Sequence, residues 1–324
     1  MKVSIIASVA LAAMVAAAPT AQNDKTRRVQ GINLTGMTEK ELKAVVAKVK
    51  KDPEVQEILE RLKGTTNEEK MTVMDVGKKG LAYNDANALP PFIGRASWAY
   101  NWGAALNAPN FEGVPMCWGG GGDCDANGVF QKLDQGNTPF VLGYNEPDFP
   151  IEYGGSHMSP QTAYDFWGND MFRFQDRGAQ LVCPGISSYD TENSQFTGIA
   201  SGFTWLRQWA NWRNNPDEFR CVAQPLHWYG VNGMSGADQA FLFIDYMNNA
   251  HNVVNDIFRR DMPLWVTEFA PEPLYNPDVL ADFVGIAASW LNQQPWVHRY
   301  APFMAETMVS GGGLNRAGEN FVNA

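Results

Sequence analysis

The first 79 residues contain no Phe, Trp, Tyr or Cys, although the 324-residue chain has 18 Phe, 11 Trp, 10 Tyr and four Cys. A segment so poor in large apolar side chains cannot build a substantial core alone. The rest of the chain is poor in lysine, because Lys132 is the only one after residue 79. That part of the chain holds 11 basic and 25 acidic residues. Such an acidic domain is repelled by nucleic acid and by anionic membranes, whereas a neutral sugar is compatible with it.

The chain begins like a secretory signal peptide. Met1-Lys2 supplies a positive start, and residues 3–18 form an apolar run rich in small residues. The run is too short and too rich in alanine for a membrane span, and the alternative is a buried N-terminal helix. We therefore expect residues 1–21 to be a signal and the protein to be secreted, to the extracellular space or the cell wall. There is no C-terminal hydrophobic tail for a lipid anchor.

Residues 22–79 predict a charged helical arm. Thr38 and Glu41 form a capping-box pattern at the start of one helix, and a second helix is expected after Pro53. The dibasic pair Lys78-Lys79 lies where the composition changes, which suggests a propeptide that is cleaved there. The alternative is an arm that the mature protein retains.

The four cysteines are an even number, and secretion permits disulfides. Cys117 and Cys124 are close in sequence around a Gly-rich loop, which would leave Cys183 to pair with Cys221, although sequence alone allows three connectivities. No histidine lies near them at ligand spacing, so zinc is not expected. No cofactor or metal is predicted anywhere in the chain.

From residue 80 onward, strand-like runs alternate with helical ones, which predicts an α/β fold with a parallel sheet and, over this length, a (β/α)8 TIM-type barrel. The expected strands are 96–102, 113–119, 138–146, 180–186, 225–230, 263–269 and 298–304. The expected helices are 159–174, 203–212, 237–260 and 278–293. The eighth strand should fall between residues 119 and 136, unless the barrel is one strand short or irregular. We assign 80–324 to one catalytic domain.

Two glutamates, Glu146 and Glu268, each follow a strand-like apolar run. A carboxylate at the end of a buried strand is costly unless it is partnered or lies in a cleft. In a (β/α) barrel the carboxyl ends of the strands carry the catalytic groups. Two such carboxylates are the minimum for hydrolysing a glycosidic bond. The alternative for either glutamate alone is a salt bridge to a neighbouring loop.

Polar neighbours strengthen this interpretation. Asn145 could hydrogen-bond a sugar hydroxyl, and Tyr229 could keep a nucleophilic carboxylate ionised and oriented. The same strand contains His227, whose alternative is a satisfied core histidine; the alternative for Tyr229 is packing with one hydrogen bond.

Aromatic residues cluster where the first two expected strands end. Trp102 and Trp118, together with Tyr100 and the adjacent Asn101, are the candidates for a platform under pyranose rings. The alternative is that both tryptophans fill the barrel interior.

Several segments together resemble glycoside hydrolase family 128, the alkali-sensitive-linkage-like fungal cell-wall glucanases. They are GLAYN at 80–84, SWAYNW at 97–102, PM at 115–116, LGYNEPD at 142–148, HWYG at 227–230 and WVTEF at 265–269. The resemblance implies a barrel of the large retaining clan, activity on β-1,3-glucan, Glu146 as acid/base and Glu268 as nucleophile. The sequence departs from the family at 149–157, a longer loop, and at Pro302, where an aromatic residue is expected.

These observations predict a secreted retaining β-1,3-glucanase that acts without a cofactor, with β-glucan as its partner and the monomer as its state. One alternative is a retaining hydrolase of another β-glycan, such as mannan or β-1,4-glucan. Another is a non-catalytic glucan-binding protein on the same fold, which would need neither glutamate.

Overall fold

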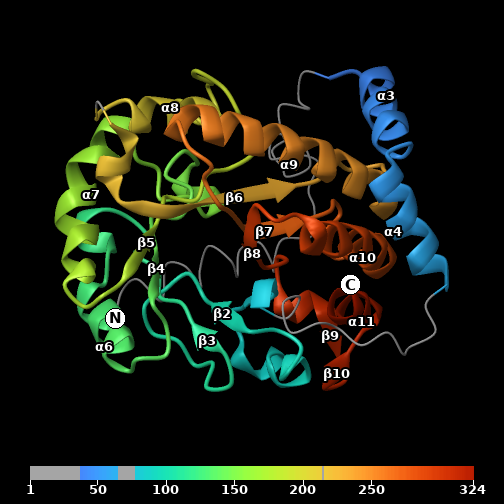
Figure 1. The fold of residues 1–324 in the computed structure, drawn as a ribbon, viewed down its shortest axis with the longest axis horizontal. Coiled ribbons are helices and arrows are strands. Elements are labelled where there is room, and N and C mark those ends of the chain that lie inside the picture. Colours follow the sequence, from blue (N-terminus) through green and yellow to red (C-terminus); the bar gives the residue numbers. More distant parts are fainter. Residues whose placement is uncertain (1–36, 65–76, 214) are drawn as a thin grey trace.

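The computed structural model describes residues 37–64, 77–213 and 215–324, which form a mixed α/β fold around parallel strands (Figure 1). A curled five-stranded parallel sheet, in the order β4-β5-β6-β7-β8, makes up half of a barrel. A three-stranded parallel sheet, β1-β2-β3, lies beside it. The strands are β1 (Gly80–Ala82), β2 (Trp98–Tyr100), β3 (Glu112–Gly113), β4 (Phe140–Leu142), β5 (Gln180–Val182), β6 (Cys221–Tyr229), β7 (Leu264–Ala270) and β8 (Val297–Tyr300). A short antiparallel pair, β9 (Val309–Ser310) and β10 (Gly313–Leu314), follows.

Isolated parallel bridges link the two sheets at both edges. Met116, just after β3, pairs with Leu142 of β4. At the other edge, Lys79, just before β1, pairs with Tyr300 of β8. Backbone hydrogen bonds therefore pass from each sheet to the other on both sides.

A second cluster of buried side chains joins the two sheets, with members in their strands or in the residues that directly follow them. The shared cluster is Ala82, Trp98, Tyr100, Val114, Met116, Leu142, Val182, Ala223, Trp265, Ala270, Ala301, Phe303 and Met304. Arg299 of β8 reaches into this interior, 4.7 Å from the Trp265 ring, and forms an ion pair of 2.7 Å with Glu112 of β3. Packing is tight enough that a Cβ on Gly80 would lie 2.1 Å from the Trp98 indole, so only glycine fits there.

The helices cover the outside of the sheets (Figure 1). They are α6 (Ala126–Asp134), α7 (Pro160–Gln175), α8 (Gly202–Ala210), α9 (Gly236–Phe258), α10 (Pro277–Gln293) and α11 (Arg316–Asn323). The four helices predicted in this region correspond to α7, α8, α9 and α10, and each of these predictions is confirmed. The start of α7 follows the expected chemistry, because Ser159 caps it by accepting from the Thr162 amide and Pro160 occupies the first turn.

The prediction of a strand between residues 119 and 136 is wrong. That stretch holds a short 3-10 turn and α6, which Asp125 caps by accepting from the Gly128 amide. The strand that sequence reading missed is β1, only three residues long and directly after two lysines. Its strand character comes from pairing and burial rather than from a local pattern.

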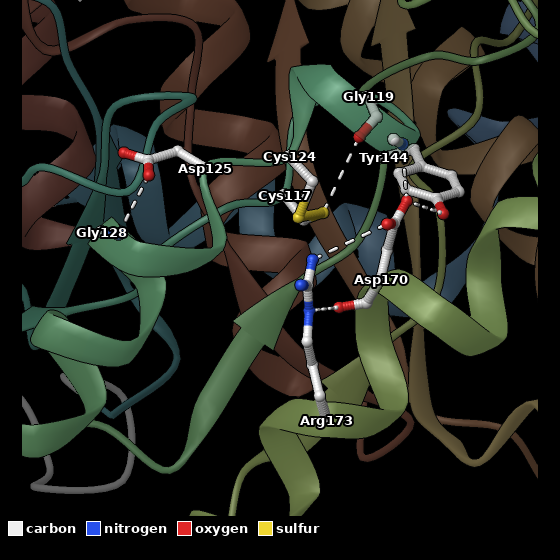
Figure 2. Close-up of a disulfide and its surroundings, with 9 residues drawn as sticks. Cys117, Gly119, Cys124, Asp125, Gly128, Tyr144, Asp170 and Arg173 are labelled. Carbon is white, nitrogen blue, oxygen red and sulfur yellow. Dashed lines mark hydrogen bonds and ion pairs between the residues drawn. A yellow bond between two sulfur atoms is a disulfide. The ribbon is translucent and has the colours of Figure 1, made fainter.

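Both expected disulfides are confirmed: Cys117 pairs with Cys124, and Cys183 with Cys221. Figure 2 shows how the first one sits beside a buried carboxylate. Asp170 of α7 accepts from the Gly121 amide at 2.8 Å and from the Tyr144 hydroxyl at 3.0 Å. The Gly-rich loop that carries Trp118 is thus fixed by a covalent bond and by a helix carboxylate.

The predicted arm helices are confirmed as α3 (Glu39–Val49) and α4 (Pro53–Gly64), with the Thr38 capping box in place. The two helices pack on α9 and α10 (Figure 1). Their apolar side chains Val49, Val55 and Ile58 are buried in the main hydrophobic core.

The dibasic pair at the end of the arm is part of the folded domain. Lys79 is completely buried, and its ammonium donates to the carbonyl oxygens of Val322 and Ala324. The Lys78 ammonium donates to the carbonyls of Asn292 and Gln294.

Residues 1–21, the predicted signal peptide, lie outside the described residues. Among the helices that the structure describes, none combines the length and apolar character needed to cross a bilayer.

Candidate active site

Glu146 and Glu268 meet at the carboxyl ends of the strands. Glu268 lies within β7, and Glu146 lies four residues beyond the end of β4. An oxygen of each carboxylate lies within 4.8 Å of the other, and a nitrogen of His227 lies within the same distance of both. Both glutamates are buried, so each charge depends on the partners around it.

Two side chains hold Glu268, one from the bend just after β2 and one from β6. The indole Nε1–H of Trp102 donates to its Oε1 at 2.7 Å, and the Tyr229 hydroxyl donates to its Oε2. Burial and then the charge of Glu268 raise the pKa of Tyr229 well above its ordinary value, so the phenol stays a donor. Trp102 has a left-handed backbone (φ 60°), an uncommon conformation for a non-glycine residue and one that is often found at functional sites.

Glu146 is held mainly by loop backbone. It also has a left-handed φ, of 39°. Its carbonyl accepts from the amides of Phe149 and Ser156, and the preceding amide, that of Asn145, donates to the carbonyl of Trp118 at 2.8 Å. The disulfide-bonded loop therefore supports the backbone of the acid-bearing loop directly.

His227 of β6 lies between the two carboxylates. Its Nδ1 is 2.9 Å from Glu146 Oε1 and 3.5 Å from Glu268 Oε1, and its Nε2 is 2.8 Å from the Thr267 hydroxyl. Burial lowers the pKa of His227, but the charge of Glu268 and the hydrogen bond and charge of Glu146 outweigh it and raise the pKa to about 8.

Burial sets the protonation of Glu146. It raises the pKa of this carboxyl to about 7, the contacts with His227 opposing the rise and the charges of Glu268 and Asp148 adding to it. A carboxyl that keeps its proton near neutral pH is what acid catalysis of glycoside cleavage needs.

Asp148 anchors the loop that follows Glu146. It is completely buried, and its carboxylate accepts from the Ser187 amide and hydroxyl and from the Gly202 amide. The loops after β4 and β5 are joined through this one side chain.

The other predicted site residues fall into two groups. Asn145 lies beside the carboxylates; its amide Nδ2 donates to the Gly154 carbonyl, while its buried Oδ1 has no hydrogen-bond partner among the described residues. Trp118 is half-buried at the edge of the interior cluster. Tyr100 and Asn101 do not fit the predicted platform: Tyr100 is fully buried, its hydroxyl donating to the Thr267 carbonyl, and the Asn101 amide bonds the Ala105 carbonyl in its own turn.

Three residues of the site were missed by sequence reading. Phe303 packs its ring 5.6 Å from Trp102 and 5.5 Å from Tyr229, which supplies an aromatic residue one position after Pro302. Thr267 and Asp148 each lie next to or near a recognised glutamate. Their side chains contribute through contacts with residues distant in sequence: Thr267 with His227, and Asp148 with Ser187 and Gly202. The sequence alone does not indicate these contacts.

The spacing of Glu146, His227 and Glu268 is one that a metal ion could bridge. Hydrogen-bond donors already face these oxygens, however: Trp102 and Tyr229 donate to Glu268, and His227 Nδ1 faces both carboxylates. A nitrogen that contacts two carboxylate oxygens is stable there with a proton, not with a bare lone pair. The donor set fits a hydrogen-bonded site better than a metal centre.

A family model described as the glycosyl hydrolase catalytic core matches residues 80–321, which leaves the arm outside the match. A search of curated proteins finds no match. A search of solved structures finds similar chains from several subgroups of glycoside hydrolase family 128.

Three of these structures illustrate the likeness. A curdlan-specific exo-β-1,3-glucanase of subgroup III from Blastomyces gilchristii, in complex with glucose, is 25% identical, with a TM-score of 0.63 over 77% of this chain and 99% of that one. An endo-β-1,3-glucanase of subgroup II from Sorangium cellulosum is 25% identical, with a TM-score of 0.60 over 76% and 98%. A subgroup I endo-β-1,3-glucanase from Amycolatopsis mediterranei, in complex with laminaritriose and laminaribiose, is 26% identical, with a TM-score of 0.57 over 76% and 99%. The chain is therefore a glycoside hydrolase and belongs to the glycosyl hydrolase catalytic core family, within glycoside hydrolase family 128.

Proposed function

We propose that this glycoside hydrolase cleaves β-1,3-glucan with retention of configuration, using Glu146 as acid/base and Glu268 as nucleophile. The observation that carries the proposal is the carboxylate pair, with oxygens within 4.8 Å of each other. Retaining enzymes place the two carboxyl groups about 5 Å apart, whereas inverting enzymes leave room for a water between them. The similar structures are of β-1,3-glucanases, which favours this linkage.

In the first step, Glu268 attacks the anomeric carbon while Glu146 gives its proton to the glycosidic oxygen. The C–O bond to the leaving sugar breaks, and a glycosyl ester forms on Glu268. Trp102 and Tyr229 orient the attacking carboxylate. The raised pKa of Glu146 keeps the proton available.

In the second step, Glu146 is a carboxylate and takes a proton from water. The water oxygen attacks the anomeric carbon, the ester bond breaks, and Glu268 leaves as a carboxylate. Two inversions restore the original configuration. The unpaired Oδ1 of Asn145 is suited to accept from a sugar hydroxyl beside these groups.

We further propose that the two sheets form one closed (β/α)8 barrel. The edge bridges Met116–Leu142 and Lys79–Tyr300 support closure, as does the interior cluster, whose members lie in or directly after strands of both sheets. In this arrangement both glutamates lie at the carboxyl-terminal mouth, where barrel enzymes carry their sites.

One experiment separates the proposal from its rivals. The purified protein is incubated with linear β-1,3-, β-1,4- and mixed-linkage glucans and with mannan, and product lengths are read by chromatography. We expect products from β-1,3-glucan. Turnover of mannan or β-1,4-glucan alone points to a different β-glycan, and binding without products points to a glucan-binding protein. Light scattering of the same sample tests the expected monomer.

We propose that the protein is secreted, with residues 1–21 removed, and that the arm stays with the barrel. Buried Val55 and Ile58, and the enclosure of Lys79, favour retention, because a protease could reach the bond after Lys79 only by opening the barrel edge. N-terminal sequencing of secreted protein tests this. A mature start upstream of the arm helices is expected, and a start at Gly80 would mean that the arm is a propeptide cleaved before folding.

A further inference from the structure

Thr267 is the residue directly before Glu268 in β7. It is buried, and its Oγ1 lies 2.8 Å from His227 Nε2. Its backbone carbonyl accepts from the fully buried Tyr100 hydroxyl at 2.7 Å, which fixes this part of the strand. The imidazole is therefore held between a hydroxyl on one edge and two carboxylates on the other.

We propose that Thr267 is a positioning residue: its hydroxyl holds His227 so that an Nδ1–H always faces Glu146 Oε1, which leaves Oε2 of Glu146 to carry the catalytic proton. This inference rests on the function proposed above and adds a residue to it.

The chemistry of the hydroxyl explains why it suits this task. The charged groups that face the imidazole are Glu146, Glu268 and Asp148, so a bare lone pair on Nδ1 would be repelled. When His227 is neutral, the Thr267 hydroxyl can donate to Nε2, which places the single ring proton on Nδ1. When His227 is protonated, the same hydroxyl can accept from Nε2–H. The Nδ1–H is thus kept in both states.

The consequence is a division of work between the two oxygens of Glu146. With Oε1 occupied by the imidazole at 2.9 Å, the proton that Glu146 gives and takes back resides on Oε2. Loss of the hydroxyl leaves Nε2 buried without a partner, and the ring escapes that cost by rotating or by changing tautomer. Acid catalysis then suffers before nucleophilic attack does.

The test compares wild type with Thr267→Val, Thr267→Ser and the control Thr138→Val. Thr138 is a buried threonine whose hydroxyl donates to Glu112 and accepts from the Phe140 amide, so the control also loses buried hydroxyl hydrogen bonds. Values of kcat/KM are measured on a laminari-oligosaccharide and on a 2,4-dinitrophenyl β-laminarioside. The dinitrophenolate departs without protonation, so kcat/KM on that substrate does not need the acid.

We expect Thr267→Val to lower kcat/KM on the oligosaccharide roughly 10- to 100-fold, with little change on the aryl glycoside. Thr267→Ser should recover most of the lost kcat/KM. Thr138→Val should change kcat/KM by the same factor on both substrates. Equal losses on both substrates for Thr267→Val, or no loss on either, would overturn the proposal.

A second measurement uses the unaltered protein. Nitrogen-15 shifts of His227 should show a protonated Nδ1 across the pH range of activity, and a bare Nδ1 there contradicts the proposal even if Thr267→Val does not fold. A different result would disprove the proposed function itself. If Glu268→Gln still turned over the aryl glycoside, the two-glutamate mechanism would be wrong, whatever the role of Thr267.

Discussion

The two sides of the active site are built differently. Glu268 lies inside a strand, and its two oxygens accept from Trp102, just after β2, and from Tyr229 at the end of β6. Glu146 lies beyond its strand, in a left-handed backbone conformation held by loop amides and by the carbonyl of Trp118. The side of the proposed nucleophile is thus fixed by strand β7 and its neighbours, and the side of the proposed acid/base by loops that a disulfide and buried carboxylates secure.

This difference predicts how a substitution on each side should change the activity. Damage to the nucleophile side should stop every substrate from reacting, because no other group can form the glycosyl ester. Damage to the acid/base side should depend on the leaving group, because a good leaving group needs no proton. The predictions below use that distinction.

The largest effect is expected for Glu268→Gln. An amide has the same shape but cannot form the ester, so kcat on laminari-oligosaccharides and on aryl glycosides should fall at least roughly 10⁴-fold. Calorimetry should show glucan binding close to that of wild type. Substantial turnover by the purified variant would remove Glu268 from the nucleophile role.

Glu146→Gln should lose activity selectively. On oligosaccharides kcat/KM should fall roughly 10²- to 10⁴-fold, since the general acid is gone. On a dinitrophenyl glycoside a burst of dinitrophenol should remain, followed by slow turnover that azide accelerates by replacing water. If the burst disappears too, Glu146 is doing more than proton transfer.

The pH dependence of kcat/KM should also differ between the oligosaccharide and the aryl glycoside. Glu146 has a pKa raised to about 7 and must be protonated to act as an acid, so kcat/KM on oligosaccharides should decline as pH rises through about 7. The aryl glycoside should lack this alkaline decline. An identical decline with both substrates would assign it to another group.

The two disulfides should differ in what they protect. The Cys117–Cys124 loop, with a separation of 7, supports Trp118 and Asn145, whereas Cys183–Cys221, with a separation of 38, closes a longer loop. Replacing Cys183 and Cys221 by Ser should cost about 4 kcal/mol of unfolding free energy, and replacing the other pair about 2.5 kcal/mol. Only the Cys117/Cys124 variant should lose oligosaccharide activity, by a few-fold, with the aryl glycoside spared. If the two variants lost the same activity, the Cys117–Cys124 loop would have no special role in supporting Glu146.

The smallest kinetic effect is expected from the arm. Ile58→Ala removes a buried side chain on α4 and should lower the unfolding free energy by about 2–5 kcal/mol, while kcat/KM on both substrates stays unchanged. Thermal melting and kinetics on the same preparation test this. A melting temperature equal to that of wild type would show that the arm does not brace the barrel.

Sequence alone predicted much of this molecule. The four long helices, both disulfides and the capping box at Thr38 follow from local periodicity, cap chemistry and cysteine spacing, and all three appear in the structure. Strand β1 and helix α6 escaped because a three-residue strand has no period and a Gly-rich stretch hides one.

The limits at the site have a similar cause. Glu146, Glu268, His227 and Tyr229 were predicted as site residues because strand ends in a parallel barrel converge, and the structure brings these four side chains together. The contacts on which their proposed roles depend, such as Trp102 to Glu268 and Thr267 to His227, join residues whose relative position only the folded chain determines. Tyr100 was misjudged because sequence does not reveal which aromatic ring at a strand end faces inward.

The most direct test of the central claim is to trap the glycosyl enzyme. A 2-deoxy-2-fluoro laminarioside with an activated leaving group slows the second step more than the first, so the ester accumulates. Peptide mass spectrometry should then find one added fluorosugar on the peptide that contains Glu268, with the bond at its carboxyl group. A labelled Glu146, or an enzyme that turns over the reagent with no adduct and releases product of inverted configuration, would contradict the account.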